Sequence, residues 1–195
     1  MREIYDAFEE AGYYCQHFLL NASTMGVPQK RERVFFVCLR RDLADKFLYQ
    51  KDLFTVVPKI NMDFNEPPIK YKEFADYEGD EIKAEGMLKY IYERQRGDVA
   101  LSDAVERRGE KRKFFNQQYL YEDMVSYTLT AHKDSIVPFE NPRWLSKQET
   151  CSIATFPQDY DFKSTPFWEM CGRAVPPVMM ANLSSRVYEY WLSKL

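Results

Sequence analysis

The chain has 195 residues, 45% of them hydrophobic and 16% aromatic, a composition that excludes an intrinsically disordered protein. Its formal net charge of −3 excludes a globally basic nucleic-acid binder, so a contact with nucleic acid would come from a local patch. No apolar run is long enough to span a membrane, and the N-terminus lacks the apolar core of a signal peptide. The spacing of the four cysteines, Cys15, Cys38, Cys151 and Cys171, predicts no zinc site and favours reduced thiols in a cytoplasmic protein.

The first forty residues predict the end of an α/β domain. Apolar residues at helical spacing predict a helix over residues 2–11, and Gly12 is a suitable C-cap. Residues 13–21 and 31–40 then predict two strands separated by a loop. Since no crossover element separates them, we expect the strands to be antiparallel. Two strands and one helix cannot cover both faces of a sheet, so this segment is not expected to form a whole domain.

The loop before the second predicted strand carries an unusual set of polar side chains, in the stretch GVPQKRER at residues 26–33. Because side chains alternate along a strand, Arg31 and Arg33 are expected on one side and Glu32 on the other. The two guanidinium groups would converge with the Gln29 amide at one end of the strand, which favours binding over packing. The alternative is a hairpin corner with solvated arginines.

Residues 42–141 differ in character, with prolines, scattered charge and little periodicity, and they predict a separate small domain. A helix is expected within residues 80–96, although Gly86 weakens it. The most basic stretch, at residues 107–115, has aromatic residues beside its charges. It could bind phosphates in a salt-dependent way or be a solvated run of charge. Its candidate DNA-binding residues are Arg107, Arg108, Lys111 and Arg112.

Helical signals return after Pro142. Ser146 and Glu149 fit a capping box that begins a helix ending near Thr155, before Phe156 and Pro157. A second short helix is expected over residues 166–170. A turn containing Gly172 then leads to the last helix, which begins at one of the prolines of the 176–177 pair. The start of that helix could present backbone amides to an anion, although its apolar stripe alone indicates core packing.

Taken together, these stretches resemble the C-terminal half of the DNA (cytosine-5) methyltransferases. The resemblance begins with the Gly-Tyr pair at 12–13 and LNA at 20–22, and GVPQKRER resembles the eighth motif of the family. The ninth and tenth motifs resemble RWLS at 143–146 with Glu149 and FPQDY at 156–160, and GRAVPP at 172–177. Thr128 and Leu129 lie in TLTA, which resembles the Thr-Leu element of the family's target-recognition domain.

The resemblance implies an α/β fold, namely the C-terminal part of a Rossmann-like S-adenosylmethionine-dependent methyltransferase domain. Residues 1–41 and 172–195 would supply its strand hairpin and helices. Residues 42–171, which include the ninth motif, would form an inserted small α+β target-recognition domain. The implied substrate is double-stranded DNA, and no membrane is involved. The implied location is the cytoplasm, in association with the nucleoid, in a protein of bacterial or phage type.

The resemblance also implies a chemistry. The family flips the target cytosine out of the duplex, adds a thiolate to it, and transfers a methyl group from S-adenosylmethionine. Arg33 would hold the cytosine oxygen and stabilise the charge that develops as the thiolate attacks. Arg31 and Gln29 would line the same pocket, and Thr128 and Leu129 would lie near the target base and its phosphate.

For the cofactor, the resemblance points to the segment Gly172, Arg173, Ala174 and Val175. The family commonly has Gly-Asn-Ser before Val-Pro-Pro, and here Arg173 and Ala174 replace the polar pair. Backbone contacts to S-adenosylmethionine could survive this change, whereas the side-chain hydrogen bonds would be lost or replaced.

Three features of the family are absent from this sequence. None of the four cysteines follows a proline, as the family's nucleophile does, and the Gly-rich cofactor loop and the Glu-Asn pair are missing. The chain alone is therefore not expected to methylate DNA. It could be one subunit of a split enzyme whose partner carries the nucleophile and the main cofactor site, an inactive truncated remnant, or a stand-alone DNA-binding module. We expect it either to pair with a complementary N-terminal chain or to self-associate.

Overall fold

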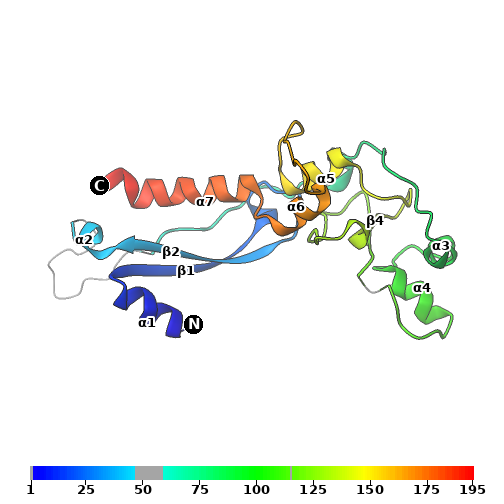
Figure 1. The fold of residues 1–195 in the computed structure, drawn as a ribbon, viewed down its shortest axis with the longest axis horizontal. Coiled ribbons are helices and arrows are strands. Elements are labelled where there is room, and N and C mark those ends of the chain that lie inside the picture. Colours follow the sequence, from blue (N-terminus) through cyan, green and yellow to red (C-terminus); the bar gives the residue numbers. More distant parts are fainter. Residues whose placement is uncertain (1, 47–58, 115) are drawn as a thin grey trace. The chain divides into compact units, whose positions relative to one another are not determined.

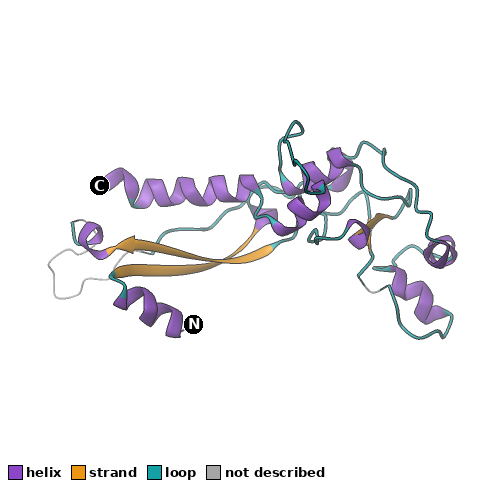
Figure 2. Cartoon of the chain, in the orientation of Figure 1, coloured by secondary structure: helices purple, strands orange, loops and turns teal. Residues whose placement is uncertain are grey.

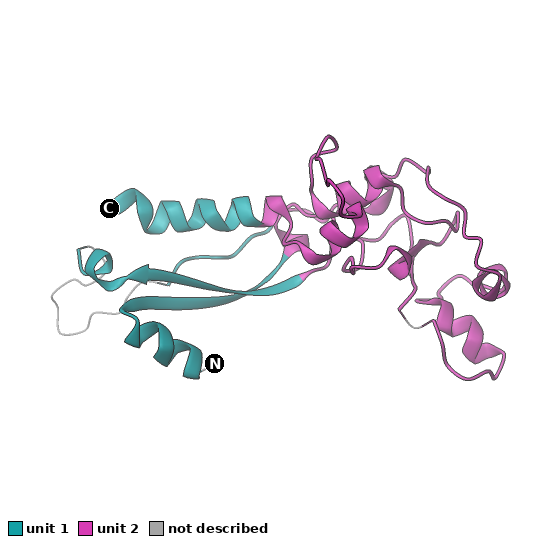
Figure 3. Ribbon diagram, viewed as in Figure 1, with its two compact units in different colours: residues 1–21, 32–65, 180–195 teal, residues 22–31, 66–179 magenta. Residues whose placement is uncertain are grey.

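The computed structural model describes residues 2–46, 59–114 and 116–195. These residues divide into two units, which are coloured separately in Figure 3. Unit 1 comprises residues 1–21, 32–65 and 180–195, and unit 2 comprises residues 22–31 and 66–179. Part of the predicted small domain, residues 47–58, and Phe115 of the basic stretch lie outside the described residues.

Unit 1 is built on an antiparallel hairpin (Figures 1 and 2). Helix α1 (Arg2–Glu10) is followed by Gly12, whose φ of +82° suits glycine, and then by strand β1 (Tyr13–Asn21). Strand β2 (Glu32–Arg40) pairs with β1 from Tyr13 opposite Arg40 to Asn21 opposite Glu32, and the short helix α2 (Arg41–Ala44) follows. The predicted helix, strands and antiparallel pairing are confirmed.

The two faces of the hairpin are covered by different segments. On one face, Phe8 of α1 stacks on Phe36 of β2 with ring centroids 6.3 Å apart. On the other, Tyr14 makes an edge contact with Trp191, which follows helix α7 (Pro177–Tyr190) and precedes the 3₁₀ turn Leu192–Lys194. The buried Gln16 side chain accepts a hydrogen bond from the backbone N–H of Ile60, at 2.9 Å. Residues near 60 are therefore held to β1 through a side chain.

Unit 2 consists mostly of short helices and loops. Its helices are α3 (Glu85–Tyr92), α4 (Leu101–Arg107), α5 (Lys147–Ala154) and α6 (Phe167–Arg173), with 3₁₀ turns at Ala22–Thr24, Tyr71–Glu73 and Lys133–Ser135. Strands β3 (Gln118–Leu120) and β4 (Ile136–Pro138) form a parallel pair. Neither strand was predicted, because three residues are too few for a periodic signal.

Two predicted helices of unit 2 have different bounds in the structure. The helix expected within residues 80–96 covers only Glu85–Tyr92, because the preceding segment is held by tertiary contacts. The carbonyl of Asp80 accepts a hydrogen bond from the N–H of Trp144, and Ile82 is buried outside the helix. The helix expected over residues 166–170 extends to Arg173. The predicted turn at Gly172 is therefore wrong, since Gly172 lies in the last turn of α6.

The core of unit 2 has two main clusters of buried apolar side chains. The larger one brings α5 and α6 together with the Tyr71 turn, and its members are Tyr71, Leu120, Leu129, Ile136, Leu145, Cys151, Ile153, Ala154, Phe162 and Cys171. The second lies between α3 and α4, and its members are Ile82, Met87, Ile91, Leu101, Tyr119 and Val137. In the described parts of the chain, no helix has the length and apolar character that crossing a membrane requires.

Candidate functional site

The stretch from Ala22 to Arg31 forms a closed loop. The N–H of Ala22 donates to the carbonyl of Arg31 at 3.0 Å, and Gly26 adopts a φ of +71° inside the loop. The N–H of Lys30 donates to the carbonyl of Ser126 at 2.8 Å. The hydroxyl of Thr128 donates to the carbonyl of Lys30 at 2.5 Å. The main-chain N–H and carbonyl of Lys30 thus connect the predicted Gln-Arg stretch to the Thr-Leu element and the residues just before it.

Gln29 is fully buried and uses both ends of its side-chain amide. Its Nε2 donates to the carbonyl of Ile153 in α5 at 3.2 Å. Its Oε1 accepts from the N–H of Leu129 at 3.0 Å and from Arg31 Nη1 at 3.5 Å. The single amide side chain therefore connects the loop to α5 and to the Thr-Leu element.

Arg31 is also buried, with 1% of its surface exposed. Its Nη1 donates to the carbonyl of Leu129 at 3.1 Å, and its Nη2 donates to the carbonyl of Gly172 at 2.9 Å. The carbonyl of Gly172 lies in the last turn of α6, where the helix dipole favours a positive charge. Solvated arginines at a hairpin corner are therefore ruled out for Arg31, which fastens the loop to α6.

Arg33 belongs to unit 1, whereas Gln29 and Arg31 belong to unit 2. Its side chain is partly exposed, and its Nη1 donates to the carbonyl of the preceding residue, Glu32, at 2.6 Å. Gln29 and Arg31 thus meet as predicted, but as buried groups that hydrogen-bond to the protein main chain. Arg33 is the member of the predicted set whose side chain is not committed to packing.

Gly172 explains why α6 can approach the Thr-Leu element. A methyl group at this position would collide with the backbone of Thr130 and Ala131. Gly172→Ala is therefore expected to lower the free energy of unfolding by about 1–3 kcal/mol, as overpacking does. The matched control is Gly86→Ala in α3, where no atom lies within 4 Å of the added methyl. That control is expected to raise stability by about 0.5–1 kcal/mol, because alanine favours a helix over glycine. Urea unfolding of both variants measures the difference, and equal midpoints would contradict the clash.

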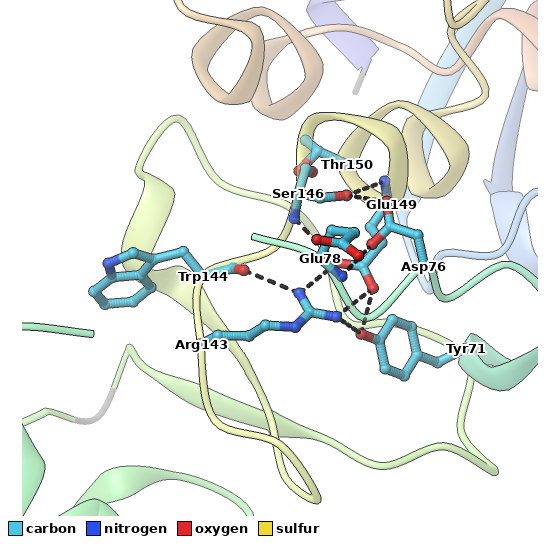
Figure 4. A network of polar contacts seen from close by, with 8 residues as sticks. All are labelled: Tyr71, Asp76, Glu78, Arg143, Trp144, Ser146, Glu149 and Thr150. Carbon is cyan, nitrogen blue, oxygen red and sulfur yellow. Dashed lines mark hydrogen bonds and ion pairs between the residues drawn. The ribbon is translucent and has the colours of Figure 1, made fainter. Parts of the chain in front are cut away.

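A buried ion pair organises the start of α5 (Figure 4). Both guanidinium Nη atoms of Arg143 donate to the carboxylate of Glu149 at 2.7 Å. Glu149 Oε1 also accepts from the hydroxyl of Tyr71 at 2.6 Å, and Arg143 Nη1 donates to the carbonyl of Trp144. The exposed fractions of the Arg143 and Glu149 side chains are 5% and 0%. Arg143 and Glu149 are residues of the predicted motif, whereas Tyr71 was not predicted, because it lies too far away along the chain to leave a local signal.

The capping box at Ser146 is confirmed and joins this network. The Oγ of Ser146 accepts from the N–H of Glu149 at 3.0 Å, and Glu149 Oε2 accepts from the N–H of Ser146 at 3.0 Å. The Ser146 hydroxyl donates to Asp76 at 2.6 Å (Figure 4). Helix α5 ends at Ala154, and the next residue, Thr155, caps it in a left-handed conformation. One carboxylate therefore caps a helix and neutralises a buried arginine.

Burial and the Glu149 carboxylate together determine the pKa values of Tyr71 and Arg143. Burial first, and then the hydrogen bond to Glu149, raise the pKa of Tyr71 above its ordinary value, so Tyr71 remains a proton donor. Burial alone would lower the pKa of Arg143. The hydrogen bonds and charge of Glu149 outweigh burial and raise that pKa. The arginine thus stays charged, although it is almost completely shielded from solvent.

The basic stretch is largely neutralised by neighbouring acids. Arg107 pairs with the buried Asp98 at 2.5 Å, and Arg108 pairs with Glu93 at 2.5 Å and with Glu110 at 2.8 Å. Arg112 pairs with Glu106 at 3.0 Å, and Lys111 is exposed. Hydrogen bonds from Tyr90 first and then Arg108 lower the pKa of Glu110 to about 2. The predicted phosphate contact of this stretch stays a prediction, and Arg107 has a structural role that the sequence did not indicate.

The chain is similar in sequence and in fold to known proteins. The family model of the C-5 cytosine-specific DNA methylases matches residues 1–189. The chain belongs to this family. Among the curated relatives, the type II methyltransferase M.BbvI of Brevibacillus brevis is 28% identical in an alignment of 180 residues, which covers 85% of this chain and 46% of the relative. The type II methyltransferase M1.HphI of Haemophilus parahaemolyticus is 25% identical over 95% of this chain and 50% of the relative.

Solved structures show that the chain shares the methyltransferase fold. The S. pombe Dnmt2 methyltransferase has a TM-score of 0.56 at 12% identity, covering 96% of this chain and 61% of that one. A mutant of Spodoptera frugiperda DNMT2 has a TM-score of 0.60 at 16% identity, covering 96% and 62%. The predicted family is confirmed by the family model. The chain spans about half the length of the curated relatives named above.

The four residues predicted to contact the cofactor of a methylase offer little side-chain chemistry. Gly172 is buried in α6, and the exposed Arg173 pairs with Glu169 at 2.9 Å. Ala174 caps the end of α6, and Val175 is half-buried. Apart from the guanidinium of Arg173, these residues present only backbone groups and apolar side chains. The predicted backbone contact of these residues with S-adenosylmethionine stays a prediction. Among the described residues, no cluster of three or more His, Cys, Asp or Glu side chains could hold a metal ion.

Proposed function

We propose that this chain is the C-terminal portion, or a subunit, of a DNA (cytosine-5) methyltransferase. It supplies target recognition and one side of the pocket for a flipped cytosine. The observation that carries the proposal is the loop of residues 22–31, whose Gln29 and Arg31 are fastened to the Thr-Leu element while Arg33 follows on β2. None of the four cysteines follows a proline, so a complementary chain supplies the nucleophile and the main site for S-adenosylmethionine.

Gln29 and Arg31 of the loop and Arg33 of β2 then have different roles. Arg33 holds the cytosine oxygen and stabilises the negative charge that develops on the ring during attack, a task that suits a fixed guanidinium. Gln29 and Arg31 are positioning residues, because their hydrogen-bonding groups are already used by the protein main chain. The flipped base is reached by Arg33, and the loop that precedes it is held still by the other two.

The surface of unit 1 supports the need for a complementary chain. Leu19 and Val34 lie directly opposite each other on the hairpin and are 64% and 51% exposed. Tyr188 and Leu192, four residues apart at the C-terminal end of the chain, are 60% and 47% exposed. In the described part of unit 1 the sheet has two strands, so a strand edge remains for pairing. We propose that the complementary methyltransferase chain covers these groups, with self-association as the result in its absence.

Target recognition is proposed for residues 42–171, as an inserted α+β domain that contacts double-stranded DNA. Thr128 and Leu129 connect this region to the loop of the cytosine pocket. In the basic stretch, Lys111 and Arg112 are the candidates for phosphate contact, since Arg107 is committed to the buried Asp98. The proposed place of action is bacterial or phage-infected cytoplasm, at the nucleoid.

Co-expression tests this function. The chain is produced alone and together with a neighbouring reading frame that carries the Pro-Cys and Gly-rich motifs, and methyl transfer to DNA is measured. Activity only in the pair is expected, with a stable complex in sedimentation. A chain that stays a clean monomer at micromolar concentration, and that gains no activity from such a frame, would favour the inactive remnant.

DNA binding by the chain alone separates the remaining alternative, a recognition module without catalysis. Lys111→Ala/Arg112→Ala is expected to weaken binding and to reduce the dependence of the affinity on salt by roughly one to two counterions. The matched control is Lys163→Ala, which removes an exposed cation of the same unit that pairs with Asp161. An equal effect of both variants would show that the basic stretch is only a solvated surface.

A further inference from the structure

Cys15 and Cys38 face each other across the hairpin of unit 1. They are direct partners in the register of β1 and β2, and their Sγ atoms are 2.8 Å apart. Both are free thiols and both are partly exposed. Neither has a role in the proposed methyltransferase function, because neither has the sequence context of the nucleophile.

The position of the pair in the ladder suits a covalent bond. The N–H of Arg41 donates to the carbonyl of Gly12 at 2.9 Å, so residues 12 and 41 form a hydrogen-bonded pair of the antiparallel ladder. Pairs alternate along such a ladder, which makes Cys15 and Cys38 a non-hydrogen-bonded pair. The Cα atoms of these pairs are about 4.5 Å apart, within the range of about 4.4–6.8 Å that a disulfide spans.

We propose that Cys15 and Cys38 form a reversible disulfide when the protein meets a peroxide. The thiolate of Cys15 attacks one oxygen of hydrogen peroxide, the O–O bond breaks, and water leaves after protonation, which gives a sulfenic acid on Cys15. The sulfur of Cys38 then attacks the Cys15 sulfur and displaces hydroxide, which takes up the Cys38 proton as water. The two sulfurs lose two electrons in total and the peroxide gains them.

The geometry indicates which of the two thiols reacts first with the peroxide. Cys38 donates its S–H to the Cys15 sulfur, so Cys15 is the acceptor and Cys38 the donor of the pair. Burial, followed by the hydrogen bond to Cys15, raises the pKa of Cys38 to about 12. Because both thiols are partly exposed, a small oxidant can reach them from solvent. The product would lock the register of the two strands, one of which carries Arg33.

A second thiol pair in the same chain provides a matched control. Cys151 and Cys171 are 0% and 2% exposed, inside the larger cluster of unit 2. The two thiols are also hydrogen-bonded to each other, and this bond lowers the pKa of Cys151, so a nearby thiol partner is present there too. What this pair lacks is exposure to solvent. We therefore expect a brief peroxide treatment of the folded chain to spare it.

The experiment treats the full chain with hydrogen peroxide and counts thiols by alkylation and mass spectrometry. The native chain is expected to lose two of its four thiols and about 2 Da. A disulfide should join the peptides that contain Cys15 and Cys38, and dithiothreitol should reverse it. Cys151→Ser/Cys171→Ser should form the same linkage. Cys38→Ser should instead accumulate a sulfenic acid on Cys15 that dimedone traps. A linkage between Cys151 and Cys171, a disulfide between two chains, or irreversible oxidation without the Cys15–Cys38 linkage would overturn the proposal.

Discussion

Arg33→Ala is expected to reduce the rate of methyl transfer by about 10²–10³-fold in the enzyme formed with the complementary chain. That is the usual effect of removing one donor that stabilises charge in a transition state. The unfolding midpoint should not change, because the partly exposed Arg33 side chain donates to the carbonyl of its own neighbour in β2, Glu32. Steady-state kinetics on a DNA substrate, with urea unfolding of the same preparation, measure the two quantities.

Arg31 provides the matched comparison two residues away. Its guanidinium is buried and donates to the carbonyls of Leu129 and Gly172, so Arg31→Ala should lower stability as well as activity. Arg33→Lys adds a test of geometry, since a lysine keeps the charge but not the planar set of donors. Full methyl transfer by Arg33→Ala would remove Arg33 from the cytosine pocket. Equal loss of stability in both alanine variants would mean that Arg33, too, is structural.

Glu149→Ala is expected to lower the free energy of unfolding of unit 2 by about 3–5 kcal/mol, because it leaves the guanidinium of Arg143 buried without its counter-charge. The same change removes one of the two hydrogen bonds of the α5 capping box, and it removes the acceptor of the Tyr71 hydroxyl. Urea unfolding followed by circular dichroism and by tryptophan fluorescence measures the loss. A loss of this size is a large part of the total free energy of unfolding of a typical domain. The variant is therefore also expected to accumulate less in cells.

Two controls separate the buried charge from general damage. Arg143→Met/Glu149→Leu replaces both partners by apolar groups of similar size and should be less destabilised than Glu149→Ala, because no unpaired charge remains. Asp161→Ala removes one partner of an exposed ion pair in the same unit and is expected to leave the midpoint unchanged. If the double variant is as unstable as Glu149→Ala, the hydrogen bonds of the network matter more than its charges.

The parts of the fold that were predictable depend on neighbours in the sequence. The hairpin follows from alternation in residues 13–21 and 31–40, and the start of α5 follows from the Ser146–Glu149 spacing. The burial of Arg31 could not be predicted, because the carbonyls that hold it belong to residues about 100 and 140 positions away. The length of α3 was overestimated for a similar reason, since contacts with Trp144 hold the segment before it.

The candidate site divides along the same line. Gln29, Arg31 and Arg33 were identified from residue type and from the resemblance to the methyltransferase family. Their different exposure was not, because strand alternation treats Arg31 and Arg33 alike. The sequence around Tyr71 gave no sign of a role in the site, although its hydroxyl donates a hydrogen bond to the buried carboxylate of Glu149. A pattern of residue types thus points to a candidate stretch, whereas the burial of each of its side chains depends on tertiary contacts.

Gln29 and Arg31 hold their neighbours through main-chain atoms: the carbonyls of Ile153, Leu129 and Gly172 and the N–H of Leu129. Every residue type offers a carbonyl, and every type except proline offers an N–H. The side chains at positions 129 and 153 can therefore be exchanged for others of suitable size without loss of these hydrogen bonds. A recognition segment of new sequence could be installed between the loop and α6 while the same two side chains continue to anchor it. In the proposed enzyme, DNA specificity could thus be altered independently of the role proposed for Arg33.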